Sequence, residues 1–432
     1  MSNRPTIRQK FSFRRETSTV GAFGLLVEHR IPDSIPQFAL NFGGRWSEVT
    51  IQSSHGYTSE TGGRLVWDGS TRNPEAHLTV SLTDSLHYKD TGDWTIAKTP
   101  LYSTSPAGRN TTTATNSGSD GRRVVETPLG RVQTGAHNDV FDAFFGEGSR
   151  GYSIEEEYDV AGEGVVSETG GILYLGAYDE WSRTTDDGQQ IRLVVPDAAQ
   201  LAPEPEAVVE ALVAAANELD VGTEHDSMLA VAAPTRGVDW YHRGIGGDDG
   251  FWVRDDLRLD LSTFGGNPWI HEYIHTRQRF RSELTSATTW LTEAVASYYG
   301  AVLCFRQGLC SFERLLDHLT LRTSPGFSHG QLTDHSEFRD DDRNHLDYRK
   351  GRRVLAALDC KIQDDTAGRA TFEDVFRQLN AYDGQITNNS FIGMVADITG
   401  NSEYYEWFST YVGSANVPEV PRSKKYFINS VA

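Results

Sequence analysis

The chain has 432 residues, a formal net charge of -20 at pH 7, and a hydrophobic fraction of 38%. This length and composition predict a globular protein of two or three domains, each with its own core. Only seven of its forty cationic residues are lysines, and the others are arginines. No stretch is basic enough to form a face for nucleic acid, so a nucleic-acid partner is not expected.

The acidic composition also suggests a cellular setting. A strongly negative surface remains soluble in concentrated salt, where charge repulsion is screened within a few ångströms. We therefore expect a salt-adapted (halophilic) cytoplasm, with an ordinary acidic protein as the alternative. No apolar segment has the length of a secretory leader or a transmembrane span, so no membrane partner is expected. The sequence does not predict the oligomeric state.

Residues 1–190 alternate short β-rich runs with Gly, Asp-Gly and Asn-Pro turn signals. This pattern predicts an N-terminal all-β, sandwich-like domain. Its expected strands include residues 20–27, 38–42, 64–67, 76–82 and 171–175. Residues 111–120 are rich in Thr, Ser, Asn and Gly, and we expect a mobile loop there. The domain is expected to shape a cleft without contributing chemistry.

From about residue 190 the pattern becomes mixed and then helical. Residues 191–330 predict an α+β domain, and residues 331–432 predict a helical C-terminal part that closes its site. Expected strands are 191–195, 228–232, 251–254 and 257–261. Expected helices are 203–219, 311–321, 348–363, 371–382, 389–399 and 403–411.

A His-Glu-x-x-His motif lies at residues 271–275. On a helix, His271 and His275 lie about 40° apart and one turn along the axis, so both can bind one metal ion. Glu272 can hold a water and take its proton. Glu293 lies in a second helical pattern among apolar residues, where it could supply a third ligand. The plainer alternative is a pair of core histidines and a surface carboxylate.

Further motifs follow the first along the chain. They are WLTEAVASYYG at 290–300, YRKG at 348–351, and a run from LDCKI at 358–362 to residue 379. Together, from about residue 266 to 380, they resemble the gluzincin zinc metallopeptidases, most closely the glycyl aminopeptidase family. The resemblance implies a thermolysin-like α+β fold, a peptide substrate and a Zn²⁺ ion. It implies His271, His275 and Glu293 as ligands, Glu272 as general base, and Tyr348 as the hydroxyl that steadies the oxyanion.

The sequence departs from this family in the motif that holds the substrate's α-amine. The family has a glutamate there, whereas residues 244–250 contain none. Asp248 or Asp249, with Gly250 beside them, could replace it with a shorter reach. We expect the strand at 250–254 to be the sheet edge that binds extended substrate. The chain ends at Ala432, so we expect no C-terminal PDZ domain.

The sequence therefore predicts a zinc-dependent peptidase of aminopeptidase type. Three alternatives stay open: an endopeptidase, a catalytically idle zinc-stabilised module that binds peptides, and a hydrolase of non-peptide amides or epoxides. Cys304, Cys310 and Cys360 are predicted to be buried thiols in helices, without a disulfide. The arginines at 277, 279 and 281 are expected to pair with nearby acids or with substrate carboxylates.

Overall fold

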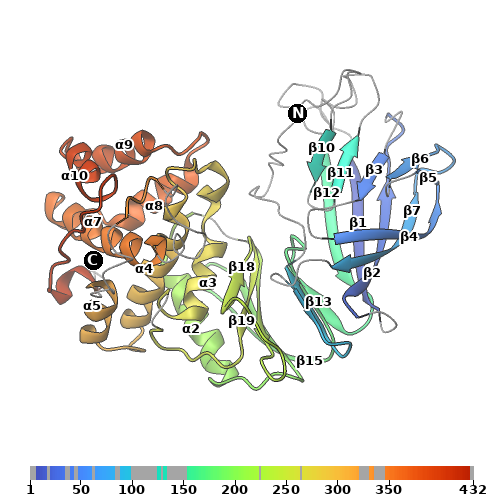
Figure 1. Cartoon of the computed structure of the whole chain (residues 1–432), viewed down its shortest axis with the longest axis horizontal. Coiled ribbons are helices and arrows are strands. Elements are labelled where there is room, and N and C mark those ends of the chain that lie inside the picture. Colours follow the sequence, from blue (N-terminus) through green and yellow to red (C-terminus); the bar gives the residue numbers. More distant parts are fainter. Residues whose placement is uncertain are drawn as a thin grey trace. The chain divides into compact units, whose positions relative to one another are not determined.

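The structure is a computed structural model of the chain (Figure 1). It describes residues 6–16, 20–34, 39–42, 47–60, 64–82, 88–98, 124–127, 130–133, 153–222, 225–262, 265–320, 330–334 and 346–428. The chain forms two compact units. The first is Met1–Asp179 with Val194–Ala198 and Arg236–His242, and the second is Glu180–Leu193, Ala199–Thr235 and Arg243–Ala432. The division into 1–190, 191–330 and 331–432 stays a prediction.

The first unit is built from three β-sheets. The first sheet has the order β12 (Ser153–Val160), β1 (Thr6–Arg15), β2 (Ala22–Arg30), β7 (Glu75–Leu82), β4 (Ser47–His55). The second has β10 (Val124–Thr127), β11 (Gly130–Gln133), β3 (Ala39–Phe42), β6 (Arg64–Trp67), β5 (Tyr57–Glu60), and the third has β13 (Gly164–Val166), β14 (Ile172–Leu175), β9 (Thr95–Lys98), β8 (Tyr88–Asp90). The prediction of a β-rich N-terminal part is confirmed. Residues 111–120 lie outside the described residues.

Alternating side chains explain why these sheets pack on one another. In β1 the apolar residues Phe11 and Phe13 are buried, whereas Arg8 and Lys10 point to the opposite face. The buried face belongs to one core that also contains Leu65 of the second sheet and residues of β14. Each large apolar side chain that is removed from water contributes about 1.5–3 kcal/mol to folding.

A fourth sheet carries the strands nearest to the predicted site. Its order is β15 (Tyr178–Thr184), β16 (Gln190–Pro196), β17 (Ser227–Ala233), β19 (Gly250–Arg254), β18 (Gly244–Gly246). The prediction that residues 250–254 form the edge is wrong, because β19 lies between β17 and β18. The edge strand is β18, whose Gly-Ile-Gly sequence has low β-propensity and gave no strand signal.

The strand predicted at residues 257–261 is also absent from the described structure, despite its alternating Leu residues. Side chains bind the backbone carbonyls that a ladder would have used. Trp269 Nε1 donates to Leu257 O at 3.2 Å, and Arg314 donates to Leu261 O at 3.0 Å. These two carbonyls are therefore satisfied without a strand partner.

The second unit is mainly helical, as Figure 1 shows in yellow to red. Its helical elements are α2 (Pro205–Glu218), α3 (Pro268–Thr276), η1 (Arg279–Glu283), α4 (Trp290–Arg306), α5 (Phe312–Thr320), a π-helical turn η2 (Asp347–Gly351), α7 (Arg352–Asp365), α8 (Phe372–Ala381), α9 (Asn388–Thr399), α10 (Tyr404–Tyr411) and η3 (Lys424–Tyr426). The six helices predicted in addition to those that carry His271 and Glu293 are confirmed to within a few residues. No described helix combines the length and the apolar character needed to cross a membrane.

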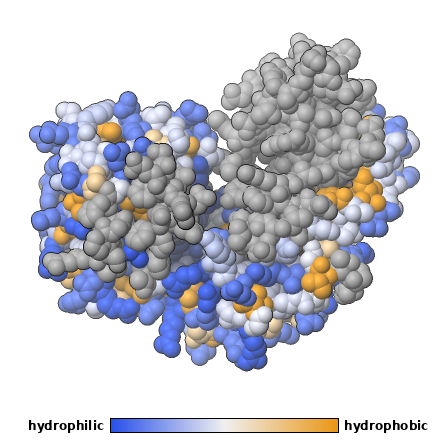
Figure 2. Space-filling model, viewed as in Figure 1, coloured by the Kyte–Doolittle hydropathy of each residue, from blue (hydrophilic) through white to orange (hydrophobic). Residues whose placement is uncertain are grey.

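The described surface is largely hydrophilic on the face that Figure 2 shows, and the three cysteines are free thiols. Figure 2 shows hydrophilic residues over most of the described part of the visible face, with apolar residues in small scattered patches. Cys304 and Cys360 are buried thiols in helices, as predicted. Cys310 is only half-buried and follows the end of α4, so its placement in a helix was wrong. Gly308 has a φ of 73°, which ends α4 before the cysteine is reached.

Candidate metal centre

The N-terminus of α3 is fixed by Asn267 and Pro268. The Asn267 side chain accepts hydrogen bonds from Trp269 N at 3.0 Å and Ile270 N at 3.2 Å, while Pro268 occupies the first helical position. The helix therefore starts in a defined place just before the motif. His271 and His275 follow one turn apart, and both are buried.

Glycines allow α4 to approach α3 closely. A Cβ at Gly300 would lie 3.1 Å from Gly265 O and 3.3 Å from His271 Cβ. A Cβ at Gly266 would lie 2.9 Å from the Gly300 backbone, and Gly266 has a φ of 86°. Because Glu293 precedes Gly300 by two helical turns, it lies on the same face of α4. The close contact thus turns Glu293 toward α3.

His271, His275 and Glu293 meet in a tight triangle of ligand atoms. The two Nε2 atoms are 3.1 Å apart, and Glu293 Oε2 lies 3.3 Å from His271 Nε2 and 3.5 Å from His275 Nε2. Glu293 Oε2 is buried and has no hydrogen bond of good geometry. Within the described ranges, this is the one group of three such residues that could hold a metal ion.

Hydrogen bonds at the outer ring nitrogens determine what the histidines offer to this triangle. His271 Nδ1 lies 2.9 Å from Gly265 O, and His275 Nδ1 lies 3.1 Å from Gln278 Oε1. A carbonyl oxygen can only accept, so each Nδ1 carries the proton. Both Nε2 atoms then direct lone pairs at the centre, which is the form that binds a metal ion.

The charges around the triangle are strongly coupled. Burial opposes the charged form of His271, but the adjacent Glu293 and Glu272 carboxylates outweigh it and raise the His271 pKa. Burial similarly raises the Glu293 pKa, yet the neighbouring His275 and His271 hold it well below its usual range. Glu293 is therefore a carboxylate at neutral pH, as a metal ligand must be.

Glu272 lies against the edge strand β18. A Cβ at Gly244 would lie 2.7 Å from Glu272 Oε1, and one at Gly246 would lie 3.2 Å from Glu272 Oε2 and 2.7 Å from His275 Cβ. Glu272 is 8% exposed. These two glycines, which were considered in the sequence only as part of residues 244–250, leave the space that its carboxylate occupies. A Gly-x-Gly spacing would place both on one face of a strand.

Tyr348 stands beside the triangle on the other side of His271. Its ring stacks on the His271 ring, with centroids 5.4 Å apart and an angle of 15° between the planes. Burial, and then the charges of Glu293 and Glu272, raise the Tyr348 pKa well above its usual range. The phenol is therefore neutral at pH 7 and keeps its proton for donation.

The residues after Tyr348 hold its π-helical turn in place. Lys350 is 1% exposed and donates to Gly330 O at 2.8 Å and to Ser414 O. A Cβ at Gly351 would lie 2.6 Å from Ala294 Cβ, so only glycine lets η2 touch α4 next to Glu293. The Lys-Gly pair thus positions the tyrosine, a role that the motif alone did not reveal.

The three predicted substrate-binding residues lie in and after the β18–β19 turn. Asp248 Oδ1 forms an ion pair with Arg281 at 3.1 Å, Asp249 is 1% exposed, and Gly250 begins β19. Their role in binding substrate stays a prediction. The expected pairing of arginines with acids is confirmed for Arg281, and also for Arg279, which lies 3.7 Å from Asp383.

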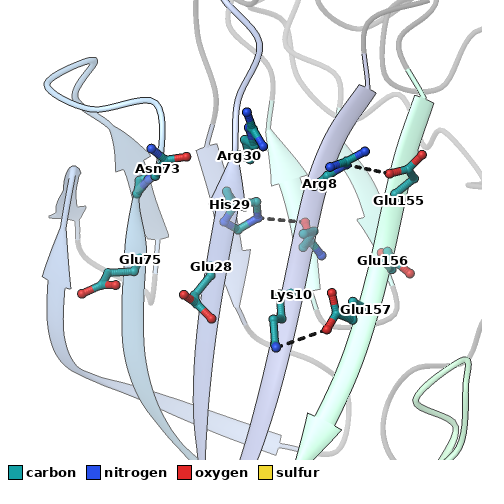
Figure 3. Close-up of a pocket in the computed structure, with 12 residues that line it drawn as sticks. Arg8, Lys10, Glu28, His29, Arg30, Asn73, Glu75, Glu155, Glu156 and Glu157 are labelled. Atoms are coloured by element: carbon teal, nitrogen blue, oxygen red, sulfur yellow. Dashed lines mark hydrogen bonds and ion pairs between the residues drawn. The ribbon is translucent and has the colours of Figure 1, made fainter.

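A second charged region lies on the first sheet of the N-terminal unit, where Figure 3 shows the side chains around an open groove of about 680 Å³. Arg8 pairs with Glu155 at 2.9 Å, and Lys10 lies 3.2 Å from Glu157. These side chains are 35–70% exposed. The groove therefore has the character of a solvated, ion-paired sheet surface.

Comparison with solved structures shows a shared fold at low sequence identity. A crystal structure of a two-domain M1 zinc metallopeptidase mutant bound to L-tryptophan has a TM-score of 0.53 and 11% identity, over 97% of this chain and 96% of that one. An M1 zinc metallopeptidase mutant from Deinococcus radiodurans, bound to a Tyr-Ser-Ala substrate, has a TM-score of 0.53 and 11% identity over 97% and 95%. An aminopeptidase N family protein from Idiomarina loihiensis has a TM-score of 0.57 and 11% identity over 96% and 77%. No protein-family model matches the sequence, and a sequence search finds no match among curated proteins.

Proposed function

We propose that this chain is a zinc-dependent peptidase whose metal ion is held by His271, His275 and Glu293. The distances in the ligand triangle carry the proposal. In a tetrahedral zinc site with bonds of about 2.0–2.1 Å, neighbouring ligand atoms lie about 3.3–3.4 Å apart. The three atoms here are 3.1, 3.3 and 3.5 Å apart. Two lone pairs and a carboxylate oxygen at such distances repel one another unless a cation lies between them.

The fold supports the same function. The solved structures with this fold include M1 zinc metallopeptidases and an aminopeptidase N family protein. Fold alone does not assign an activity, because one fold can host unrelated chemistry. The proposal therefore depends on the ligand triangle, with the likeness in fold as support.

The residues around the triangle have the chemistry of amide hydrolysis. A bound zinc ion would supply Lewis-acid polarisation of the scissile carbonyl and lower the pKa of a water. Glu272 would take the proton from the attacking water and return it to the leaving amine. Tyr348, kept neutral, would donate a hydrogen bond to the carbonyl oxygen as negative charge develops there.

The edge strand β18 would bind the substrate backbone. An extended peptide can add to the edge of a sheet as a further strand. Gly244 and Gly246 lie against Glu272, so a peptide along β18 would pass close to the general base. Glycine at these positions also keeps side chains away from the bond to be cleaved.

The aminopeptidase-like action proposed here needs an acid that holds the substrate's free amine. Asp248 or Asp249, with Gly250, is our candidate for this role. Asp248 is engaged by Arg281 at 3.1 Å, so an amine would compete with an existing cation. This ion pair favours endopeptidase action as the second candidate function.

The deciding experiment compares hydrolysis of matched peptides with free or acetylated N-termini, in molar KCl with zinc. Glu272→Gln is the matched control, because it keeps the shape of the side chain and removes the base. We expect cleavage of the free peptide, reduced roughly 10²–10⁴-fold in the variant. Zinc content of both proteins is measured by atomic absorption.

The other outcomes separate the alternatives. Cleavage of both peptides would assign an endopeptidase. If the protein binds one zinc per chain but cleaves neither peptide, while binding them, the idle peptide-binding module is correct. If neither protein retains zinc, the proposal is overturned.

A further inference from the structure

Gln278 is a buried amide that touches one proposed metal ligand and the backbone next to another. It follows α3 by two residues and is 3% exposed. Its Oε1 lies 3.1 Å from His275 Nδ1, and its Nε2 donates to Thr292 O at 2.9 Å. Thr292 directly precedes Glu293 in α4. The side chain thus connects the second ligand to the helix that carries the third.

The Thr292 carbonyl fixes the orientation of this amide. A backbone carbonyl can only accept, so the NH₂ group of Gln278 must face Thr292 and its oxygen must face His275. His275 Nδ1 then has to carry the proton that it donates to Gln278 Oε1. The lone pair consequently lies on Nε2, 3.1 Å from His271 Nε2. The tautomer of His275 therefore follows from the backbone of α4.

His271 and His275 are held by different kinds of group. Only the hydrogen-bond partner of His275, Gln278, can be removed by a side-chain substitution. His271 Nδ1 bonds to a backbone carbonyl, Gly265 O, which no side-chain substitution removes. His275 depends on a side chain, and burial excludes water that could replace it. A histidine without its outer hydrogen bond samples both tautomers and more ring orientations, and each lowers metal affinity.

We propose that Gln278 is a positioning residue that sets the tautomer of His275, and thereby the zinc affinity of the site. This inference rests on the proposed function, because it takes His275 and Glu293 as ligands. It goes beyond the motifs, since none of them includes Gln278. A glutamine one helical turn after the second histidine is the signal that the sequence offered.

The test uses two variants and a control. Gln278→Leu removes both hydrogen bonds, and Gln278→Glu keeps the acceptor for His275 while losing the donor to Thr292 O. Gln307→Leu is the matched control, because Gln307 also donates its amide to a backbone carbonyl, Ala211 O, at 3.1 Å. Gln307 bonds between helices as Gln278 does, but without contacting a ligand residue.

Zinc affinity is measured by competition with a chromophoric chelator on the folded full chain, and histidine tautomers by ¹⁵N NMR of the metal-free chain. We expect Gln278→Leu to weaken zinc binding roughly 10–100-fold and Gln278→Glu to stay within severalfold of wild type. Gln307→Leu should leave the affinity unchanged. In the spectra, the Nδ1–H signature of one histidine should be lost only in Gln278→Leu.

The outcomes distinguish this inference from the proposed function. Wild type that binds zinc, with Gln278→Leu binding it equally tightly, overturns the role of Gln278 alone. Equal weakening in Gln278→Leu and Gln278→Glu, with no tautomer change, would also overturn it, since only packing would then matter. Wild type without zinc affinity overturns the proposed function and this inference together.

Discussion

Buried histidines occur in both units of the molecule, and their hydrogen bonds separate two roles. In the N-terminal unit, His29 is 3% exposed beneath the groove of Figure 3. Gln9 Oε1 lies 2.8 Å from its Nε2, and the Tyr57 hydroxyl lies 2.8 Å from its Nδ1. Both ring nitrogens of His29 therefore have hydrogen-bond partners, and the ring is a structural part of the core.

His271 and His275 are buried to a similar degree, but only their outer nitrogens lie against a carbonyl oxygen, that of Gly265 or of Gln278. Their inner nitrogens face each other and a carboxylate. A buried polar atom without a hydrogen bond is costly, and Glu293 Oε2 is such an atom beside these two nitrogens. What distinguishes His271 and His275 is the convergence of two inner nitrogens and a carboxylate oxygen at 3.1–3.5 Å, which supports the proposed metal site. Burial and an unpaired nitrogen are not enough by themselves, because His318 is also buried and its Nε2 has no hydrogen bond among the described residues.

Removing Glu293, the proposed third ligand, should produce the largest difference between the two units. Glu293→Ala should weaken zinc binding by more than about 100-fold, because loss of a residue that only supports a ligand already costs about 10–100-fold. His29→Ala should leave one zinc per chain, although it destabilises the N-terminal unit. Chelator competition on both variants measures the effect. Equal zinc affinity in Glu293→Ala and wild type would mean that the triangle is not the metal site.

A smaller effect, a loss of peptide hydrolysis, is expected from a substitution in the edge strand β18. Gly246→Ala would put a methyl group 2.7 Å from His275 Cβ and 3.2 Å from Glu272 Oε2, displacing the proposed base and a proposed ligand. A shift of about 1 Å in a catalytic group can cost roughly 100-fold, so kcat/KM for peptide hydrolysis should fall by about that factor. Gly393→Ala is the control, because a Cβ there meets no atom within 4 Å. Similar losses of kcat/KM in both variants would show that the space left by Gly246 beside Glu272 and His275 is not the cause.

The elements that could be predicted from the sequence are those with a periodic hydrophobic pattern or a fixed residue spacing. The strands of the N-terminal unit and the helices after residue 311 follow hydrophobic periodicity, which local residues determine. His271 and His275 were correctly brought together because four residues on a helix fix their separation. Glu293 required a tertiary prediction, the pairing of two helices, which the motif supplied.

What could not be predicted depends on contacts between distant residues. β18 was missed because its glycines carry no β-propensity; their value lies in the space left for Glu272. Residues 257–261 looked like a strand until Trp269 and Arg314 were seen to bind their carbonyls. Gln278 was missed because its partners, His275 and Thr292, are joined only in the folded chain.

Because His29 is buried, the stability of the N-terminal unit is predicted to depend on pH. Burial lowers the pKa of His29 to about 3, from an unfolded value near 6.5. The unfolded chain therefore binds a proton in this window and the folded chain does not. Stability is full above pH 6.5 and falls by up to about 1.4 kcal/mol for each pH unit as the pH drops toward 3.

Tyr57→Phe removes the hydroxyl that pairs with His29 Nδ1 and should cost about 1–3 kcal/mol at pH 7. Urea unfolding followed by fluorescence between pH 4 and 8 measures both effects. The matched control is His77, which lies on the opposite, outer face of the same sheet. If His77→Asn changed the acid slope as much as His29→Asn, burial of His29 would not be the cause.

The smallest effect is expected in the groove, where charge is abundant but solvated. Arg8 and Glu155 are 65% and 61% exposed, and exposed pairs contribute about 0–1 kcal/mol. Arg8→Ala should therefore change the free energy of unfolding by less than about 1 kcal/mol and leave zinc affinity unchanged. Urea titrations at 0.1 and 2 M KCl check this, since salt should reduce even that small difference. A loss of unfolding free energy above about 2 kcal/mol that persists in high salt would show that Arg8 does more than pair with Glu155. Salt screens the interaction between exposed charges, but it does not remove the contribution of a buried or specifically bound group.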